Sequence, residues 1–237
     1  MKKVLFLTGC VNPNGMAFTI LNDVEERKHQ YVNAIQWYLS NTDFDIVFAE
    51  NTNADLSLFF KSCENHHRLE CLTFNGNDYD KRLGKGYGEA KILEYALANS
   101  LKLKDADLIV KITGRLIIMN VNVLLKECDK AGSLYVKGSS SKNKLYQSFF
   151  FAAPPSFYQL FCQNAGRLND SIGYYFEHLM YDMGVEWKKR GGKIKEFFHP
   201  IKTNGVSGST GKKYPSGIVY NIKSYIRYFL NNFLGEK

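Results

Sequence analysis

The stretch that decides the fold runs from Asp105 to Arg115 and reads DADLIVKITGR. Its apolar run, Leu108–Val110, is typical of a parallel strand that is buried on both faces. The strand ends on two cations, Lys111 and Arg115, which stand on either side of Ile-Thr-Gly. In open α/β sheets, ligands bind at the carboxyl ends of the strands. The stretch therefore predicts an anionic ligand at this strand end, although either cation could instead pair with a carboxylate of the protein.

Strands and helices alternate through the first half of the chain. The expected strands are VLFLTG (4–9), DIVFAEN (45–51), LECLTFN (69–75) and DLIVKITG (107–114), and the expected helices cover Asp23–Leu39 and Gly88–Leu101. This order predicts an α/β fold of Rossmann type, in which a mainly parallel sheet is flanked by helices.

The second half of the chain changes character. Its expected strands are SLYVKG (133–138), YQSFFFAAP (146–154) and the short KIKEFF (193–198), and its expected helices cover Ser156–Ala165 and Ser171–Met183. Residues 204–217, NGVSGSTGKKYPSG, are rich in Gly and Ser and predict a mobile loop.

The positive charge of the protein is confined to its C-terminal part. Residues 185–237 contain eleven Lys or Arg and three acidic residues, and they carry the whole formal net charge of +8. The first 184 residues have no net charge. Such a localised basic region predicts an anionic partner, either a membrane surface or a polyanion such as a nucleic acid.

The last residues of the chain have the periodicity of an amphipathic helix. Its apolar face consists of Ile222, Tyr225, Ile226, Phe229, Leu230, Phe233 and Leu234. Lys223 and Arg227 lie off this face. One interpretation is a terminal helix that packs on the core, and the other is a helix that lies in an anionic membrane surface. The basic loop before the helix favours the membrane.

Several common sites are absent from the sequence. The first strand is followed by TGCVNPNG, which lacks the G-x-G-x-x-G spacing of a dinucleotide site, and the chain has no P-loop and no G-x-S-x-G elbow. GSTGK, near Gly208, has a phosphate-binding composition, but no strand leads into it. The five cysteines are scattered without a C-x-x-C pair, which argues against a zinc site or a disulfide framework and fits a reducing cytoplasm.

Polar groups gather instead at the ends of the expected strands and at helix starts. They are Thr8 and Gly9 at the end of the first strand, Arg27 in the first helix, Glu50 and Asn51 at the end of the second strand, Lys85, Gly86 and Glu89 in RLGKGYGEAK, and Thr113, Gly114 and Arg115 after Lys111. The backbone N–H groups and the dipole of a glycine-rich helix start favour an anion, although the glycines could equally mark a flexible loop. Facing one sheet edge, these groups would surround a pyrophosphate.

Three of these segments resemble a known family. ENTN (50–53), GKGYGEAKILEYAL (84–97) and ADLIVKITGR (106–115) look like parts of small bacterial GT-A-type glycosyltransferases, which act in capsule and O-antigen polysaccharide assembly. The resemblance covers about residues 1–200. It implies a GT-A-like catalytic domain over residues 1–203, with a donor half of about 1–118 and an acceptor half of about 119–203. The basic loop and the amphipathic helix occupy 204–237.

The resemblance implies a nucleoside-diphosphate sugar, expected to be UDP-linked, as the donor that the residues above would bind. Many GT-A enzymes carry Asp-x-Asp at the position of KITGR, where it holds a divalent metal on the diphosphate. This sequence has Lys111 and Arg115 there, and Asp105 and Asp107 lie at the wrong end of the strand. We therefore predict no metal ligand, while a requirement for Mg or Mn stays open. The two cations are expected to neutralise the leaving diphosphate directly.

The expected catalytic carboxylate lies in NDSIGYYFEHLMYDMG (169–184). Glu177 shares a polar stripe with Asp170 and two tyrosines, and the family places an acidic residue on the corresponding helix. We predict that Glu177 is the general base, with Asp170 as a second catalytic candidate. The alternatives are a solvated glutamate and an aspartate that caps the helix.

His199 completes the predicted donor site. It follows KIKEFF, at a position where some GT-A enzymes bind the metal or the diphosphate. A lone histidine more often has a structural role than a ligand, so the alternative is a packed side chain.

The sequence as a whole predicts a glycosyltransferase that acts in the cytoplasm, peripherally associated with the inner face of the membrane. Its expected partners are a nucleotide-sugar donor, a glycan or lipid-linked acceptor and an anionic membrane surface, and no nucleic acid is expected. A non-enzymatic polyanion or nucleic-acid-binding protein would use the same basic region, but it has no need of charged residues that converge on one sheet edge. A nucleotidyltransferase would need a metal-binding acidic pair, which the sequence does not show.

Overall fold

The computed structural model describes residues 1–13, 15–16, 19–137, 144–215 and 217–233. Over these residues, the main sheet contains seven strands in the order β3-β2-β1-β4-β7-β6-β8. Their bounds are β1 (Lys3–Gly9), β2 (Asp45–Glu50), β3 (Leu69–Thr73), β4 (Leu108–Thr113), β6 (Ser133–Val136), β7 (Phe150–Ala153) and β8 (Lys193–Glu196), and a separate small sheet pairs β5 (Ile117–Ile118) with β9 (Thr203–Asn204).

Seven α-helices occur in the described part of the chain. They are α1 (Val24–Asn41), α2 (Gly84–Asn99), α3 (Leu101–Lys104), α4 (Val121–Glu127), α5 (Pro155–Gln163), α6 (Phe176–Lys189) and α7 (Ile218–Phe233). Short 3-10 helices are η1 (Ser57–Phe60), η2 (His66–Arg68), η3 (Lys81–Leu83), η4 (Ala165–Arg167) and η5 (Asp170–Ile172).

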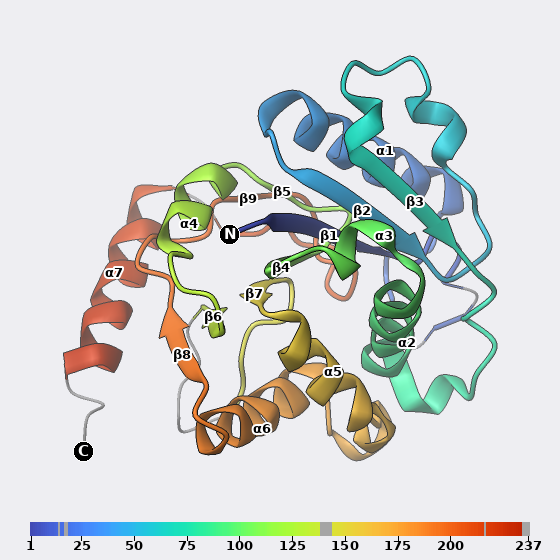
Figure 1. Cartoon of the computed structure of the whole chain (residues 1–237). Coiled ribbons are helices and arrows are strands. Elements are labelled where there is room, and N and C mark those ends of the chain that lie inside the picture. The colour runs from blue at the N-terminus through green and yellow to red at the C-terminus, as the bar shows by residue number, and fades with distance from the viewer. Residues whose placement is uncertain (14, 17–18, 138–143, 216, 234–237) are drawn as a thin grey trace.

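The main sheet is mostly parallel. β1 is parallel to β2 and β4, β2 is parallel to β3, and β6 is parallel to β8, whereas β7 is antiparallel to both of its neighbours. The predicted α/β fold is thus confirmed. The chain leaves β1 toward β2 and β3, and α2 and α3 then return it to β4 on the other side of β1 (Figure 1). The strand order therefore reverses between β1 and β4, and a ligand crevice is expected at their carboxyl ends.

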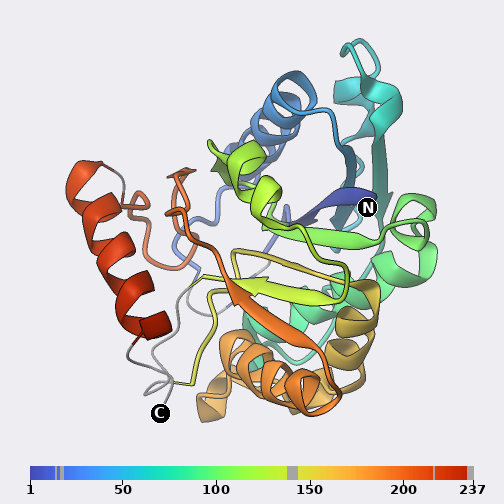
Figure 2. The ribbon, with the colours of Figure 1, turned by 60° about the vertical axis from the view of Figure 1, so that its left-hand side comes forward.

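Helices cover both faces of the sheet and enclose two apolar cores (Figures 1 and 2). One core contains Tyr38 of α1 and Leu124 of α4. The other contains Leu93 of α2, Phe157 of α5 and Leu179 of α6. Because each central strand contacts both cores, it is apolar at consecutive positions, which explains the runs seen in the sequence.

Helix α2 begins at Gly84, one turn before its predicted start at Gly88. The glycines of its first turns let other elements approach closely. A Cβ at Gly86 would lie 3.1 Å from the backbone nitrogen of Phe176, and one at Gly88 would lie 2.2 Å from the hydroxyl oxygen of Tyr79. The glycine-rich stretch is thus a close-packed helix start, and not a flexible loop.

Helix α6 begins later than the sequence predicts, at Phe176 instead of Ser171. The preceding residues form a tight turn, in which the backbones of Asn169 and Tyr174 exchange hydrogen bonds of 3.1 Å. Gly173 makes this turn possible, since its φ is 76°.

The segment after β9 is a folded hairpin rather than the loose loop that its composition predicts. We call residues 203–214 the C-terminal hairpin. Val206 and Lys213 pair across it, and the backbone N–H of Ile20 donates to Gly208 O at 3.0 Å. Since backbone hydrogen bonds hold this segment, its lack of apolar residues does not leave it unpacked.

Helix α7 lies at the edge of the molecule beside α4 and β8 (Figures 1 and 2). The expected C-terminal helix is thus present. Of its predicted apolar face, the Phe233 side chain and Leu234 fall outside the described residues, as does Gly138 of the predicted strand 133–138. Among the described residues, every helix is too short or too polar to span a lipid bilayer.

Candidate functional site

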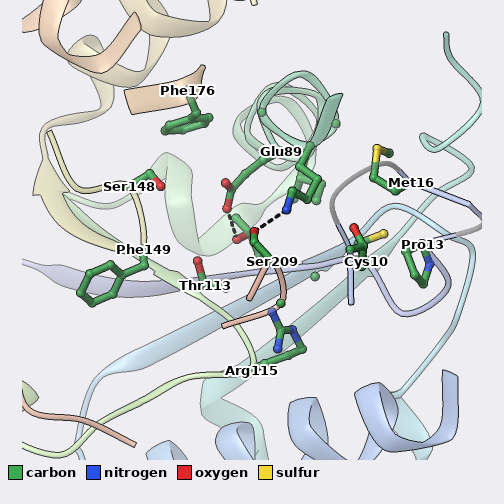
Figure 3. Close-up of a pocket in the computed structure, with 18 of the residues that line it drawn as sticks. Cys10, Pro13, Met16, Glu89, Thr113, Arg115, Ser148, Phe149, Phe176 and Ser209 are labelled. Carbon is green, nitrogen blue, oxygen red and sulfur yellow. Dashed lines mark hydrogen bonds between the residues drawn. The ribbon is translucent and has the colours of Figure 1, made fainter. Parts of the chain in front are cut away.

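A cavity of about 470 Å³ lies where the strand order reverses, at the carboxyl ends of β1 and β4 (Figure 3). The starts of α2 and α6 and the C-terminal hairpin complete its wall. Eleven of the predicted site residues line it, namely Thr8, Gly9, Arg27, Asn51, Lys85, Gly86, Glu89, Thr113, Arg115, Asp170 and Glu177. Its volume is in the range of about 300–1,000 Å³ that small-molecule sites occupy.

The floor of the cavity contains a buried ion pair. Lys111 has no exposed side-chain surface, and its Nζ lies 2.5 Å from Oε1 of Glu89. The same Nζ donates to Ser148 O at 2.7 Å, and the Thr8 hydroxyl donates to Glu89 Oε1 at 2.7 Å. This placement of Lys111 differs from the predicted contact with a diphosphate, because a buried ammonium group that is already bound by protein oxygens presents nothing to a ligand. Lys111 instead fixes Glu89 to the end of β4.

Besides Arg27, two other cations line the cavity. They are Lys85 of α2 and Arg115 (Figure 3), which follows β4. Arg115 Nη1 donates to Gln30 Oε1 at 3.1 Å and to Val206 O at 3.2 Å, while its buried Nε has no partner among the described residues. Burial lowers the pKa of Lys85, and the charge of Arg115 acts in the same direction, whereas Asp170 raises it. An anion between the two cations would stabilise both of their charged forms.

The C-terminal hairpin closes the cavity on the side of these cations. Lys85 Nζ donates to the hydroxyl of Ser209. A Cβ at Gly208 would lie 2.6 Å from Nη2 of Arg115, so only glycine allows this approach without a shift. Tyr214 also lines the cavity. The hairpin thus supplies a hydroxyl and an aromatic ring to the site.

The first turn of α2 holds a carboxylate of the protein itself. Oδ2 of Asp170 accepts a hydrogen bond from the backbone N–H of Lys85 at 3.1 Å, and its buried Oδ1 has no partner among the described residues. Burial raises the pKa of Asp170, and the bond from Lys85 opposes that shift. The predicted anion site at this helix start is therefore occupied by Asp170. Asp170 does not cap α6, since α6 begins only at Phe176.

We expect Gly84→Ala to destabilise the protein more than an ordinary glycine substitution. Gly84 has a φ of 85°, and a Cβ there would lie 2.0 Å from the carboxyl group of Asp170. Gly132→Ala is the matched control, because Gly132 has a φ of 78° and nothing within 4 Å of its Cβ position. Overpacking should make the Gly84 variant less stable than the control by about 1–3 kcal/mol in urea denaturation. If the Gly84→Ala and Gly132→Ala variants lose the same stability, the close contact between Gly84 and Asp170 is contradicted.

Glu177, the predicted base, lies in the first turn of α6 and is only partly exposed. The Ser148 hydroxyl donates to its Oε1. Because the Ser148 carbonyl also accepts from Lys111, this one residue connects the buried ion pair to the Glu177 carboxylate. Tyr175, which is 43% exposed, and Phe176 line the cavity beside it. Glu177 is therefore a held carboxylate in a cavity rather than a freely solvated one.

The part of the cavity near β2 contains an unpaired acceptor. Asn51 is 2% exposed, and its Oδ1 has no hydrogen-bond partner among the described residues. Arg27, 5% exposed, donates to the carbonyls of Cys10 and Leu21 and thereby holds the loop after β1. Burial raises the pKa of the Cys10 thiol to about 11, so this cysteine is neutral at physiological pH. The Oδ1 of Asn51 is thus a buried acceptor in the wall of the cavity.

Three more predicted donor-site residues do not line the cavity. Glu50 has no exposed surface, and its carboxylate accepts hydrogen bonds from three backbone N–H groups of the neighbouring loops. The N–H of Gly114 donates to Thr8 O at 2.9 Å and ties the ends of β4 and β1 together. His199 lies beside α7, where its Nδ1 is 2.7 Å from Oε1 of Glu127. Their partners within the protein give all three a structural role.

A likeness to known proteins is found for this chain among solved structures. No protein-family model matches it, and no curated protein does. A structure from Desulfovibrio desulfuricans G20 is among the similar ones. It belongs to a protein to which nucleotide-diphospho-sugar transferase activity has been ascribed, and it shares 13% sequence identity and a TM-score of 0.46 over 83% of this chain and 80% of that chain. A likeness of this extent shows nothing about function. Any proposal about function therefore depends on the chemistry of the cavity.

The residues at the end of β4 do not fit a divalent metal. Lys111 and Arg115 stand where the resemblance to GT-A-type glycosyltransferases would imply an acidic pair. Asp107 lies at the opposite end of the strand, where it accepts from the backbone nitrogen of Lys2. Among the described residues, no group of three or more His, Cys, Asp or Glu side chains could hold a metal ion.

Ser148, Ser209 and Tyr214 line the cavity but were not among the predicted site residues. Ser148 is the polar residue before the apolar run of β7, and its importance follows only from the pairing of β7 with β4. The two hairpin residues stand in a segment whose GSTGK composition suggested phosphate. That composition was the one indication in the sequence that this segment binds a ligand. It did not show that the segment folds against the cavity.

Proposed function

We propose that the protein is a glycosyltransferase, which moves a sugar from a nucleoside-diphosphate sugar to a hydroxyl group of an acceptor. The observation that carries this proposal is one cavity that combines two cations, Lys85 and Arg115, with the carboxylate of Glu177. The cations suit a diphosphate leaving group, and the carboxylate suits the deprotonation of a hydroxyl. The resemblance of three sequence segments to GT-A-type glycosyltransferases points to the same reaction.

In a transfer with inversion, the acceptor hydroxyl gives its proton to Glu177 while its oxygen attacks the anomeric carbon. The new C–O bond forms as the bond from the anomeric carbon to the diphosphate oxygen breaks, and the electron pair of that bond leaves with the nucleoside diphosphate. Lys85 and Arg115 stabilise the negative charge that develops on this leaving group. Ser148 is a positioning residue in this mechanism, because it holds the carboxylate through its hydroxyl.

The two ends of the cavity suit the two substrates. The nucleoside would lie toward Asn51 in the cavity wall, and UDP is the nucleoside diphosphate that we expect. The acceptor would approach Glu177 past Tyr175 and Phe149, whose rings line the cavity. The resemblance favours a glycan or lipid-linked acceptor in bacterial surface polysaccharide synthesis.

Replacing Arg115 by Ala tests the donor site directly. The variant should bind UDP and UDP-sugars about 10- to 150-fold more weakly in isothermal titration calorimetry, since a hydrogen bond to a charged group contributes about 1.5–3 kcal/mol. Arg82→Ala is the control, because Arg82 is exposed, pairs with Asp80 and does not line the cavity. Unchanged affinity in a folded Arg115→Ala protein would place the donor elsewhere.

Experiments can distinguish the proposed glycosyltransferase from a polyanion-binding protein. Such a protein would bind nucleic acid through its basic region with strong salt dependence and would show no thermal stabilisation by any nucleotide sugar. A glycosyltransferase of the kind proposed should be stabilised by its donor, because a ligand that binds only the folded state raises the melting temperature. A panel of nucleotide sugars, with and without EDTA, separates these outcomes.

A further inference from the structure

Helix α7 lies beside the body of the protein (Figures 1 and 2). It packs there through its polar and aromatic side. Ser224 is 9% exposed. The rings of Tyr225 and Tyr228 each lie 5.2 Å, between centroids, from the ring of Phe198, which follows β8. The ammonium group of Lys137 lies 5.6 Å from the centroid of the Tyr228 ring. The body of the protein therefore contacts the less apolar side of the helix.

The opposite side of α7 is apolar and exposed. We call Val219, Ile222, Ile226 and Leu230 the outer face of α7, and their exposed fractions are 67%, 53%, 53% and 51%. At 3.6 residues per turn these positions fall within an arc of about 80°, on the other side of the helix from Ser224. A surface helix of a globular protein normally turns its apolar stripe to the core. The orientation of α7 is the reverse, which indicates a surface that another molecule covers.

Basic residues accompany this outer face. Lys223 and Arg227 are exposed on α7 next to it, and Lys212 and Lys213 are exposed in the C-terminal hairpin. From residue 197 to residue 235 the sequence contains no acidic residue. The covering partner is therefore expected to present negative charge around an apolar layer.

We infer that α7 lies in the surface of an anionic lipid membrane, with its outer face among the acyl chains. A bilayer rich in acidic lipids offers an apolar interior beneath a negative surface, and a helix with this distribution of side chains binds in that interface. The long side chains of Lys223 and Arg227 can reach headgroup phosphates while the helix is immersed. This inference does not depend on the proposed reaction.

A second copy of the chain fits the outer face less well. In a symmetric dimer the same patch meets itself, so Lys223 and Arg227 of both copies would be brought together. No acidic residue of α7 is available to balance them, since the acid-free stretch includes the whole helix. Like charges that face each other disfavour such a contact, especially at low ionic strength.

Flotation of the full chain with lipid vesicles tests the inference. The protein should float with vesicles of phosphatidylcholine and phosphatidylglycerol at low ionic strength, and much less with phosphatidylcholine alone. About 0.5 M salt should reduce the binding, because it screens the charges beyond a few ångströms. Each basic residue near an anionic surface strengthens binding about fivefold, so Lys223→Gln with Arg227→Gln should weaken it about 25-fold. Lys188→Gln with Lys189→Gln, on α6, is the matched control and should change it little.

A separate variant tests how much the apolar side chains of the outer face contribute to vesicle binding. Ile222→Ser with Ile226→Ser should weaken vesicle binding by at least about tenfold, since each loses the burial of an aliphatic side chain. Both residues are exposed in the protein alone, so the variant should fold. The control is Leu101→Ser with Ile172→Ser, whose side chains are 72% and 74% exposed elsewhere.

Two results would overturn the inference. One is a full chain that stays with the soluble fraction in the presence of anionic vesicles at low salt. The other is a dimer in analytical ultracentrifugation that the Ile222→Ser, Ile226→Ser variant abolishes, because the outer face would then be covered by a second copy. Loss of nucleotide binding in the Arg115→Ala variant has no bearing on either result, so failure here and failure of the proposed reaction are distinguishable.

Discussion

Glu177→Gln should bind the donor normally and lose about 10²–10⁴-fold in the rate of sugar transfer. Glutamine has nearly the shape of glutamate and can still accept the hydrogen bond from Ser148, so the cavity should keep its form. It cannot take a proton from the acceptor hydroxyl, and general-base catalysis contributes a factor of this size. Single-turnover assays with a saturating nucleotide sugar measure the transfer step, and calorimetry with UDP measures donor binding.

Two comparisons make this result interpretable. Glu186→Gln changes an acidic residue of the same helix that pairs with Arg190 at the surface, and it should transfer sugar at the normal rate. Ser148→Ala leaves the carboxylate in place without its hydroxyl partner, and we expect an intermediate loss of rate with normal UDP binding. Near-normal transfer by Glu177→Gln would exclude Glu177 as the base and would favour Asp170, the other candidate carboxylate of the cavity.

The mainly parallel character of the sheet could be predicted because it depends on local patterns. Leu108–Val110 is apolar without alternation, and such a run indicates a strand covered on both faces. The direction of β7 could not be predicted in the same way. Phe150 of β7 pairs with Ile112 of β4 in the antiparallel sense, and nothing in the sequence of β7 itself specifies its direction.

A residue of the candidate site could be predicted from the sequence if it lies beyond the end of its strand. Arg115 follows β4 and lines the cavity, as its position suggested. Lys111 looks similar in the sequence, but it lies within the sheet, opposite Phe6 of β1 and Phe151 of β7. The depth of a side chain is set by the register of neighbouring strands, which a single sequence does not contain. Glu50, in the last position of β2, is likewise fully buried.

The contribution of the C-terminal hairpin could not be predicted, because it depends on contacts between distant parts of the chain. Ser209 accepts from Lys85 and Val206 accepts from Arg115, across more than ninety residues in each case. These bonds use hydroxyl and backbone groups, which leave no periodic pattern in the sequence. By contrast, α7 was predictable from its periodicity, but its orientation required the structure, since the pattern shows only that one side is apolar.

Lys111→Met should destabilise the protein by about 3 kcal/mol, the lower end of the range for removing one partner of a buried ion pair. Lys111 is fully buried, and Glu89, with 22% of its side chain exposed, would lose the cation 2.5 Å away. Water can reach part of the Glu89 carboxylate, which is why the lower end applies. Urea denaturation followed by circular dichroism measures the loss. Lys102→Met, which breaks a pair with Asp45 whose side chains are 22% and 25% exposed, should cost less, about 1 kcal/mol.

The double variant Lys111→Met, Glu89→Met decides whether the unpaired charge is the cause. Removing both charges leaves no buried carboxylate without a cation, so most of the lost stability should return, and two apolar side chains in place of a buried pair are often as stable as the pair itself. If the double variant is as unstable as Lys111→Met alone, the loss comes from the bond between Lys111 and Ser148 O, or from packing, and not from Glu89. Because Ser148 also holds Glu177, the double variant should still transfer sugar more slowly than the unmodified protein even where its stability is restored. A double variant with normal stability and normal transfer would show that Lys111 has no part in positioning the base.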